Sequence, residues 1–276
     1  AGHWLYKKHG LNRNPWDRAV QFKDELISRK FPADSGFEAT YRFVVEGSVP
    51  AQVFAVVERP DLYSIQCNGK PVTAAPGEWW LDKSFGKIDL RSVVQVGENT
   101  LTLKASPFHI AHELESAYII GDFAVRPTQR GFAIAPAQPL GLGPWNEQGH
   151  RLYGHRVAYR QKFSVAEKKG RYAVELPAWY GSVARVKVNG KDAGHIGWQP
   201  WTCDVTDHIV PGANEIEVVV YGTLRNTLGP SHHPALGTAW PGMWDNQPES
   251  GPPAGDKYTS VGYGLFKPFV LKNVVQ

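Results

Sequence analysis

"DVTDHIVPGANEIEV", residues 204–218, aligns without a gap with "DLRSVVQVGENTLTL", residues 89–103. In each stretch an aspartate comes first, a Gly-x-Asn turn follows, and apolar residues then alternate with polar ones. Alternation with a period of two is typical of a strand with one buried face. The same turn and strand therefore occur twice, 115 residues apart, which indicates two similar β units.

Two further blocks extend this repeat toward the N-terminal side of each unit. "SIQCNGK", residues 64–70, matches "RVKVNGK", residues 185–191, and "YRFVV", residues 41–45, is a weaker match to "RQKFSV", residues 160–165. Asn-Gly favours a tight type I′ hairpin, because both residues tolerate a positive φ. Each unit is thus predicted to contain an opening strand and an Asn-Gly hairpin before the alternating strand.

The blocks together predict an all-β chain with two tandem antiparallel β-sandwich domains. The closing strands are expected at Asp122–Val125 and Pro268–Leu271, and a Pro- and Gly-rich connector at 126–145. The first domain is placed at residues 1–126 with an N-terminal extension, and the second at 127–276 with the connector as its lead-in. The 28 glycines and 21 prolines agree with a fold that has many turns.

Charge and hydropathy argue against nucleic-acid and membrane proteins. The net charge is only +4, and Lys7–Lys8 and Lys168–Lys169 are short, isolated basic pairs, so no nucleic-acid partner is expected. No apolar stretch reaches the roughly 20 residues that a membrane span needs. The first residues, Ala-Gly-His-Trp, have no secretion signal, so either a signal has been removed or the sequence is a piece of a longer chain.

The two cysteines occupy apolar strand positions in different repeats. Cys67 aligns with Val188, and Cys203 aligns with Ile88. A disulfide needs Cα atoms within about 7 Å, which two separate cores do not allow. Both cysteines are predicted to be small buried side chains with free thiols.

The second repeat resembles a known family. "PLGLGPWNEQGHRLYGHRVAYRQKFSV", residues 139–165, and "VKVNGKDAGHIGWQPWTCDVTDHIVPGANEIEVVV", residues 186–220, resemble the sugar-binding domain of glycoside hydrolase family two. The shared features are Leu-Gly-x-Trp, Tyr-Arg-x-x-Phe, Val-Asn-Gly-Lys, an aromatic before Asp-Val-Thr, and Pro-Gly-x-Asn. The resemblance implies galactose-binding-like jelly rolls. The segment "GTLRNTLGPSHH", residues 222–233, is similar to one near the C-terminal ends of bacterial polysaccharide-degrading enzymes.

The same resemblance implies a biological setting. Enzymes of this family carry catalysis in a separate (β/α)8 barrel, and no alternation of strands and helices occurs in this chain, so a barrel in the same parent protein is an expected partner. The resemblance further implies a secreted or periplasmic bacterial protein, and a structural calcium ion whose ligands it does not identify.

One loop distinguishes the second repeat. The connection that contains residues 224–262 is about thirty residues longer than its counterpart in the first repeat. Structureless loops of this length are uncommon and usually functional or disordered. Sugar recognition needs an aromatic face for the C–H side of the ring and planar polar groups for its hydroxyls. The predicted carbohydrate-binding residues are Trp198, Arg225, Asn226, His232, His233, Trp240, Trp244 and Asp245, with Trp179 and Trp79 as further aromatic candidates.

Two alternatives to a carbohydrate-binding region remain open from the sequence. The long loop can instead be a clamp with buried Trp side chains, and the chain a purely structural brace for a catalytic barrel. A stand-alone glycosidase needs two carboxyls roughly 5–10 Å apart. Asp245, Glu249 and Asp256 are the candidates, but they lie in Gly- and Pro-rich sequence without a rigid element. "HIAHELE", residues 109–115, is not the HExxH motif, so no metal centre is expected there.

Overall fold

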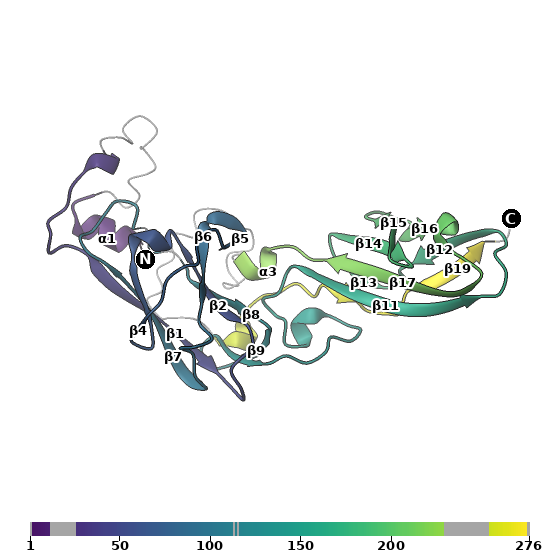
Figure 1. Ribbon diagram of the computed structural model, residues 1–276, viewed down its shortest axis with the longest axis horizontal. Helices are drawn as coiled ribbons and strands as arrows, with labels where there is room; N and C mark the ends of the chain where they lie inside the picture. The colour runs from purple at the N-terminus through teal and green to yellow at the C-terminus, as the bar shows by residue number, and fades with distance from the viewer. Residues whose placement is uncertain (1, 12–25, 113, 115, 229–253, 275–276) are drawn as a thin grey trace. The chain divides into compact units, whose positions relative to one another are not determined.

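The computed structural model describes residues 2–11, 26–112, 114, 116–228 and 254–274 (Figure 1). Of these residues 44% lie in strands and 10% in helices, and the sheets are antiparallel apart from single bridges, with none closed. The predicted all-β class is therefore confirmed. The chain divides into two compact units: Ala1–Ala137 with Trp244–Gly255, and Gln138–Met243 with Asp256–Gln276.

The first unit is built from two sheets. One has the strand order β4-β3-β7-β1-β10-β9 and the other β5-β6-β2-β8. Leu101 on β7 and Ile65 on β3 share one buried cluster with Ala55 on β2 and Ile88 on β6, so the two sheets enclose a common core. The bounds are α1 (Gly2–Lys8), β1 (Phe37–Val45), β2 (Val53–Glu58), η2 (Pro60–Leu62), β3 (Ser64–Cys67), β4 (Lys70–Pro71), β5 (Trp79–Trp80), β6 (Asp82–Asp89), β7 (Gly97–Ala105), β8 (Tyr118–Gly121), β9 (Phe123–Pro127) and β10 (Phe132–Pro136).

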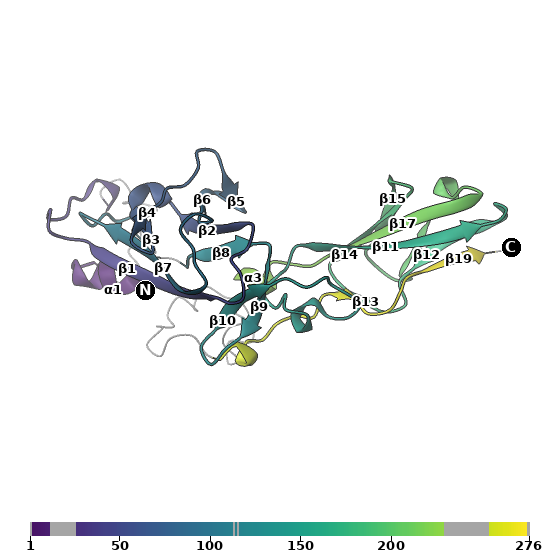
Figure 2. The same cartoon turned by 60° about the horizontal axis from the view of Figure 1, so that its bottom comes forward.

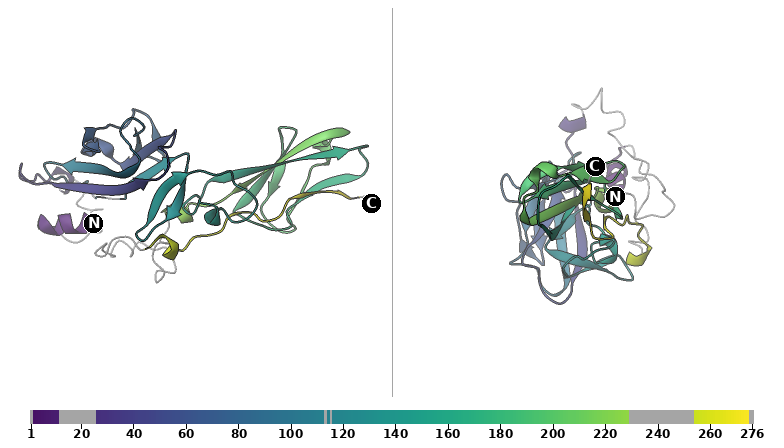
Figure 3. Two further views of the ribbon diagram at one scale, coloured as in Figure 1. Left: turned by 90° about the horizontal axis from the view of Figure 1, so that it is seen from below. Right: turned by 90° about the vertical axis from the view of Figure 1, so that its right-hand side faces the viewer.

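A smaller cluster holds the N-terminal helix to the first unit. Figure 3 shows α1 beside β1. Tyr6 of α1 is buried with Phe108 and Ile110, and Phe37 at the start of β1 packs against this cluster. The buried aromatic surface explains why a helix of only seven residues, too short to be stable alone in water, forms at this place.

The second unit also has two main sheets, β11-β17-β14-β15 and β16-β12-β19, together with the short pair β13-β18 (Figure 2). Val218 on β17, Val186 on β14 and Val174 on β12 share one core with Trp145. The bounds are η3 (Trp145–Glu147), β11 (Arg156–Val165), β12 (Arg171–Glu175), β13 (Trp179–Tyr180), β14 (Val183–Val188), β15 (Lys191–Ile196), β16 (Thr202–Asp204), η4 (Thr206–His208), β17 (Gly212–Tyr221), α3 (Arg225–Leu228), η7 (Gly255–Lys257, at the division between the units), β18 (Gly264–Leu265) and β19 (Val270–Val274).

The predicted repeat is confirmed down to individual strand pairs. The orders β3-β7-β1 and β6-β2-β8 of the first unit correspond to β14-β17-β11 and β16-β12-β19 of the second. Val45 pairs with Gly97, and the aligned Val165 pairs with Gly212. Because a slip of one residue would exchange the buried and exposed faces of a strand, equal register gives both units the same inward-facing positions.

The Asn-Gly hairpins are confirmed in both units. Asn68 and Gly69 have φ values of 51° and 75°, and Asn189 and Gly190 have 52° and 79°. Positive φ at both central positions is the signature of the type I′ turn that the dipeptide predicts. The turns join β3 to β4 and β14 to β15 in matching places.

The closing strand of the first unit differs from the prediction. The strand that pairs with β2 is β8, residues 118–121, whereas residues 123–127 form β9 and pair with β10 in the other sheet. The chain changes sheets at Asp122, whose carboxylate accepts a hydrogen bond of 2.7 Å from the Gln52 N–H. The first unit consequently includes β10 and extends to Ala137.

The prediction for the cysteines is confirmed, since Cys67 and Cys203 are both free and buried. Among the helices in the described ranges, none is long and apolar enough to cross a membrane.

Candidate functional site

A hollow of about 440 Å³ lies in the second unit between the edge strands β15 and β16. Its walls come from residues 193–196 of β15, the connection through Trp198 and Pro200, and residues 202–204 of β16. Both strands lie at the edge of their sheets, so the hollow opens where the two layers of the sandwich leave a side uncovered.

A bulge in β15 shapes one wall of this hollow. Val186 of β14 pairs with Gly194, but the next residue of β14, Lys187, pairs with Asp192, so Ala193 is the extra residue. A bulge bends an edge strand and changes the direction of its side chains. Gly194 has a φ of 138°, and a Cβ there would lie 3.0 Å from the Cys203 Sγ. Glycine at this position therefore lets β15 approach β16 closely.

Trp198 is the most exposed aromatic side chain on the lining. Its exposed fraction is 80%, whereas Ile196, two residues earlier, is 1% exposed. Trp201 on the other side packs edge-on against Trp179, with ring centroids 5.4 Å apart at 89°. The connection is thus anchored at both ends while the indole of Trp198 faces solvent. A large rigid ring in this situation offers an apolar face that the protein itself does not cover.

Asp204 supplies a charged acceptor at the edge of the hollow. Its carboxylate accepts hydrogen bonds from the Thr206 hydroxyl at 2.6 Å and the Thr206 N–H at 2.9 Å, and it forms an ion pair with Arg171. The hydroxyl, the Arg171 guanidinium and the N–H, in that order, lower the pKa of Asp204 from 3.8 to about 2. The carboxylate is therefore ionised at neutral pH, where it accepts hydrogen bonds and does not act as a general acid.

The thiol of Cys203 also lies on this lining. Burial first, and then the nearby Asp204 and Asp192, raise the pKa of the Cys203 thiol, which keeps the sulfur protonated and a poor nucleophile. Glycoside hydrolysis needs a pair of carboxyls. The lining of this hollow contributes one, Asp204, while His195 and Thr202 add further polar groups to it.

The other described residues of the predicted site lie in separate places. Trp179 on β13 is half-buried against the core, and Arg225 is exposed on α3. Asn226, also on α3, is 1% exposed. Its amide donates to the Val261 oxygen at 2.9 Å and accepts from the Val261 N–H at 2.8 Å, which joins the two described ends of the long loop. Trp79 on β5 of the first unit is 49% exposed.

Half of the predicted residues lie outside the described residues: His232, His233, Trp240, Trp244 and Asp245. Asp256, one of the candidate catalytic carboxyls, is described and lies exposed beside Lys257 at 4.0 Å. Within the described ranges, no three His, Cys, Asp or Glu side chains gather as they would around a metal ion. These residues therefore do not provide an acidic cluster for the calcium ion that the sequence resemblance implies.

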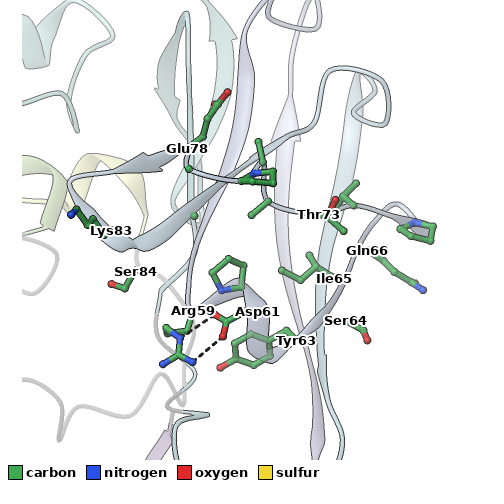
Figure 4. Close-up of a pocket in the computed structure, with 18 residues that line it drawn as sticks. Arg59, Asp61, Tyr63, Ser64, Ile65, Gln66, Thr73, Glu78, Lys83 and Ser84 are labelled. Atoms are coloured by element: carbon green, nitrogen blue, oxygen red, sulfur yellow. Dashed lines mark hydrogen bonds and ion pairs between the residues drawn. The ribbon is translucent and has the colours of Figure 1, made fainter.

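The first unit has a larger hollow, of about 820 Å³, that the sequence did not predict (Figure 4). Its walls come from residues 59–61, 63–66, 71–78, 83, 84 and 86. No motif marks it, because three short segments meet there only when η2 and the β4–β5 connection fold against β6. In each unit the hollow is lined in part by the residues that follow the Asn-Gly hairpin, 71–78 in the first unit and 193–196 in the second.

Neither a protein-family model nor a curated protein sequence matches the chain. Among solved structures, a rhamnosidase from Novosphingobium sp. PP1Y is similar at 17% identity, covering 95% of this chain and 26% of that one, with a TM-score of 0.37. The α-L-rhamnosidase of Streptomyces avermitilis in complex with L-rhamnose is similar at 17% identity over 72% of this chain and 24% of that one, with a TM-score of 0.29.

A lectin from Pleurotus ostreatus in complex with GalNAc is similar at 12% identity over 68% of each chain, with a TM-score of 0.22. The chain spans about a quarter of the length of the two rhamnosidases. With TM-scores below 0.5 and identities below 25%, these likenesses establish neither the fold nor the function of this chain.

Proposed function

We propose that this chain is a non-catalytic carbohydrate-binding region made of two tandem galactose-binding-like jelly rolls. The observation that carries the proposal is Trp198, an indole 80% exposed on the lining of a hollow that also contains polar side chains. The C–H groups of one face of a pyranose can pack on such a ring. Asp204, Thr202 and His195 lie on the same lining, where they can form hydrogen bonds with the sugar hydroxyls. An aromatic platform next to oriented polar groups is the usual composition of a small-ligand site.

The proposal places the chain in a larger enzyme. The sequence resemblance to the sugar-binding domain of glycoside hydrolase family two supports a parent protein that degrades a bacterial, plant or algal glycan. In that setting a (β/α)8 barrel carries the catalytic carboxyls, the protein is secreted or periplasmic, and this chain holds the polysaccharide near the barrel.

Affinity electrophoresis through gels that contain soluble polysaccharides tests the role of Trp198. Trp198→Ala is expected to weaken the retardation of the chain by a bound polysaccharide about tenfold or more, as loss of a central Trp contact does. Val210→Ala is the matched control, because Val210 is a 47% exposed apolar residue of the same unit outside the hollow. Equal retardation of wild type and Trp198→Ala would contradict a binding site at Trp198. Circular dichroism verifies that both variants are folded.

The long loop needs its own test. Trp240 and Trp244 remain proposed sugar contacts on the sequence argument alone, and a variant with Trp240→Ala and Trp244→Ala in the same gels measures their contribution. Loss of retardation only in this double variant would move the site from the hollow to the loop.

A structural brace is the second candidate function. It is supported by Asn226, whose buried amide closes the base of the loop on Val261, and by Trp179, which packs on Trp201. A chain that binds no polysaccharide in the panel, in wild-type form, would favour this function over carbohydrate binding.

A further inference from the structure

The hollow of the first unit lies beside a residue in an uncommon backbone conformation. Arg59 has φ 46° and ψ 56°, the left-handed region. A residue with a Cβ rarely adopts it. The conformation is held because the Arg59 N–H donates to the Ser84 oxygen of β6 at 2.8 Å. Such outliers persist where the surrounding structure fixes them, and they are concentrated at binding sites.

The conformation of Arg59 places a preformed ion pair on the wall. Its Nε donates to Asp61 Oδ1 at 3.0 Å and its terminal nitrogen to Asp61 Oδ2 at 2.9 Å, as Figure 4 shows. The two side chains are 51% and 61% exposed, so their outward edges are open to a ligand. Hydrogen bonding to Asp61 raises the pKa of Arg59, and the reverse contact lowers the pKa of Asp61, so both groups stay charged at neutral pH.

A glycine on β6 lets two of the lining segments pack closely together. A Cβ on Gly86 of β6 would lie 2.6 Å from the Pro60 Cγ and 3.1 Å from the Ala74 Cβ. Any side chain there would displace η2 or the β4–β5 connection. The half-buried Pro60 and Ala74 therefore bring apolar surface to the hollow that contains the Arg59–Asp61 pair.

The charges on this wall indicate a neutral ligand. The lining carries Arg59 and Lys83 with Asp61 and Glu78, and both carboxylates are already paired, Asp61 with Arg59 and Glu78 with Lys87 at 3.2 Å. A polyanion would meet two carboxylates, and a polycation would meet two basic groups. A guanidinium fork beside a carboxylate offers donors and acceptors a few ångströms apart. Two adjacent hydroxyls, each both a donor and an acceptor, match this arrangement, and the apolar residues match the C–H face that carries them.

We propose that the hollow at Arg59 and Asp61 is a second carbohydrate site, specific for a neutral saccharide with adjacent hydroxyls, so that each repeat carries one site at the corresponding edge. This inference rests on the proposed function for its ligand class. It differs from that function in its residues, because Trp198 and the Arg59–Asp61 pair belong to different units.

The test uses the full chain in affinity gels that contain galactan, mannan, arabinoxylan or xyloglucan, with polygalacturonate as the anionic comparison. In the Trp198→Ala background, the first unit supplies the remaining affinity for the neutral polysaccharide that retards the wild type. Adding Arg59→Gln is expected to reduce that remaining affinity about tenfold or more, because charge-assisted hydrogen bonds are lost. Arg59→Lys keeps the charge without the fork and is expected to restore only part of it.

Arg91→Gln is the matched control. Arg91 forms the same kind of pair with a residue two positions away, Asp89, with side chains 59% and 44% exposed, and it is not part of the hollow. It is expected to leave the retardation of the Trp198→Ala chain unchanged. Circular dichroism and thermal melting verify that every variant is folded.

The outcomes separate the two sites. If Trp198→Ala alone removes all binding, or if Arg59→Gln behaves like Arg91→Gln, the second site is wrong while the proposed function stands. If Trp198→Ala has no effect and Arg59→Gln removes binding, the site in the second unit is wrong and the inference stands. Stronger retardation by polygalacturonate than by every neutral polysaccharide overturns the ligand class. A wild-type chain that no polysaccharide retards overturns both sites.

Discussion

Asn99 and Asn214, each 1% exposed, connect the two motifs that recur in both units. The Asn68 amide donates to Asn99 Oδ1 at 2.8 Å, and the Asn189 amide donates to Asn214 Oδ1 at 3.0 Å. Each buried amide also donates to a backbone oxygen of its own turn, Gln95 or Val210, at 2.8 and 2.7 Å. The Gly-x-Asn turn is thereby tied to the Asn-Gly hairpin.

Asn214→Ala is therefore expected to destabilise the second unit by about 3 kcal/mol, because it leaves the Val210 N–H and the Asn189 amide without a partner. Asn99→Ala is expected to have an effect of similar size on the first unit. Glu215→Ala, an exposed neighbour of Asn214, is the control and is expected to change the free energy of unfolding by less than about 0.5 kcal/mol. Urea denaturation followed by circular dichroism measures all three, and a small effect of Asn214→Ala would contradict the role of the network.

Asp204 makes the second unit sensitive to acid. Its pKa of about 2 in the folded chain lies below the ordinary 3.8, so the unfolded chain binds the proton more tightly. The carboxylate contributes stability above pH 3.8, and this contribution is lost as the pH falls toward 2. The side chain is 47% exposed, so solvent reduces the effect. Asp204→Asn is expected to lower the melting temperature at pH 7 and to leave it nearly unchanged near pH 2. An equal difference at both pH values would show that charge is not the cause.

Residue identity alone predicted some of these roles and not others. The Asn-Gly dipeptide predicted its turn, because few pairs of residues adopt positive φ at two successive positions. Asn226 carries no comparable signal. It lies among Arg, Thr and Gly in a loop rich in sugar-binding residue types, and its 1% exposure arises from contact with Val261, 35 positions later. The Arg59–Asp61 pair was missed for the same reason, since its hollow depends on distant segments.

At the scale of elements, period-two patterns located the long strands, while short strands depend on their partners. β8 has the burial pattern intermediate, intermediate, intermediate, exposed, without alternation. Its pairing with β2 and the change of sheet at Asp122 depend on Gln52, which lies 70 residues earlier. The bulge at Ala193 was likewise not predicted. It is defined by how β15 pairs with β14, and the local sequence of β15 does not show that pairing.

The hairpin glycines allow a test free of packing effects. A Cβ on Gly190 would meet nothing within 4 Å, so any cost of Gly190→Ala comes from its φ of 79°. A left-handed conformation costs an alanine about 1 kcal/mol, and the melting temperature is expected to fall accordingly. Gly194→Ala adds contact with the Cys203 Sγ to a φ of 138° and is expected to be more destabilising. Lys191→Ala, at the exposed next position, is the control. Equal melting temperatures for Gly190→Ala and wild type would contradict the type I′ turn.

At the scale of the whole molecule, the repeat predicts two units but does not predict which segments of the chain belong to each. Ala254 forms a bridge with Gly131, and the Gly255 N–H donates to the Thr128 oxygen at 2.9 Å, so a segment late in the sequence belongs to the first unit. This pairing depends on Gly255, where a Cβ would lie 2.2 Å from the Gly131 oxygen. Alignment of the repeats cannot reveal it, because the segment has no counterpart in the other unit.

The two main cores have no residue in common, and this separation predicts how the molecule unfolds. Leu101 is fully buried in the core of the first unit, and Val218 is fully buried in that of the second. Leu101→Ala is expected to destabilise the first unit by about 3 kcal/mol through the cavity that it leaves. Differential scanning calorimetry should show one transition moved to lower temperature and the other unchanged, and Val218→Ala should move the other. Binding that depends on Trp198 should persist in the Leu101→Ala chain between the two transitions. A single transition that both variants shift equally would show that the units unfold as one.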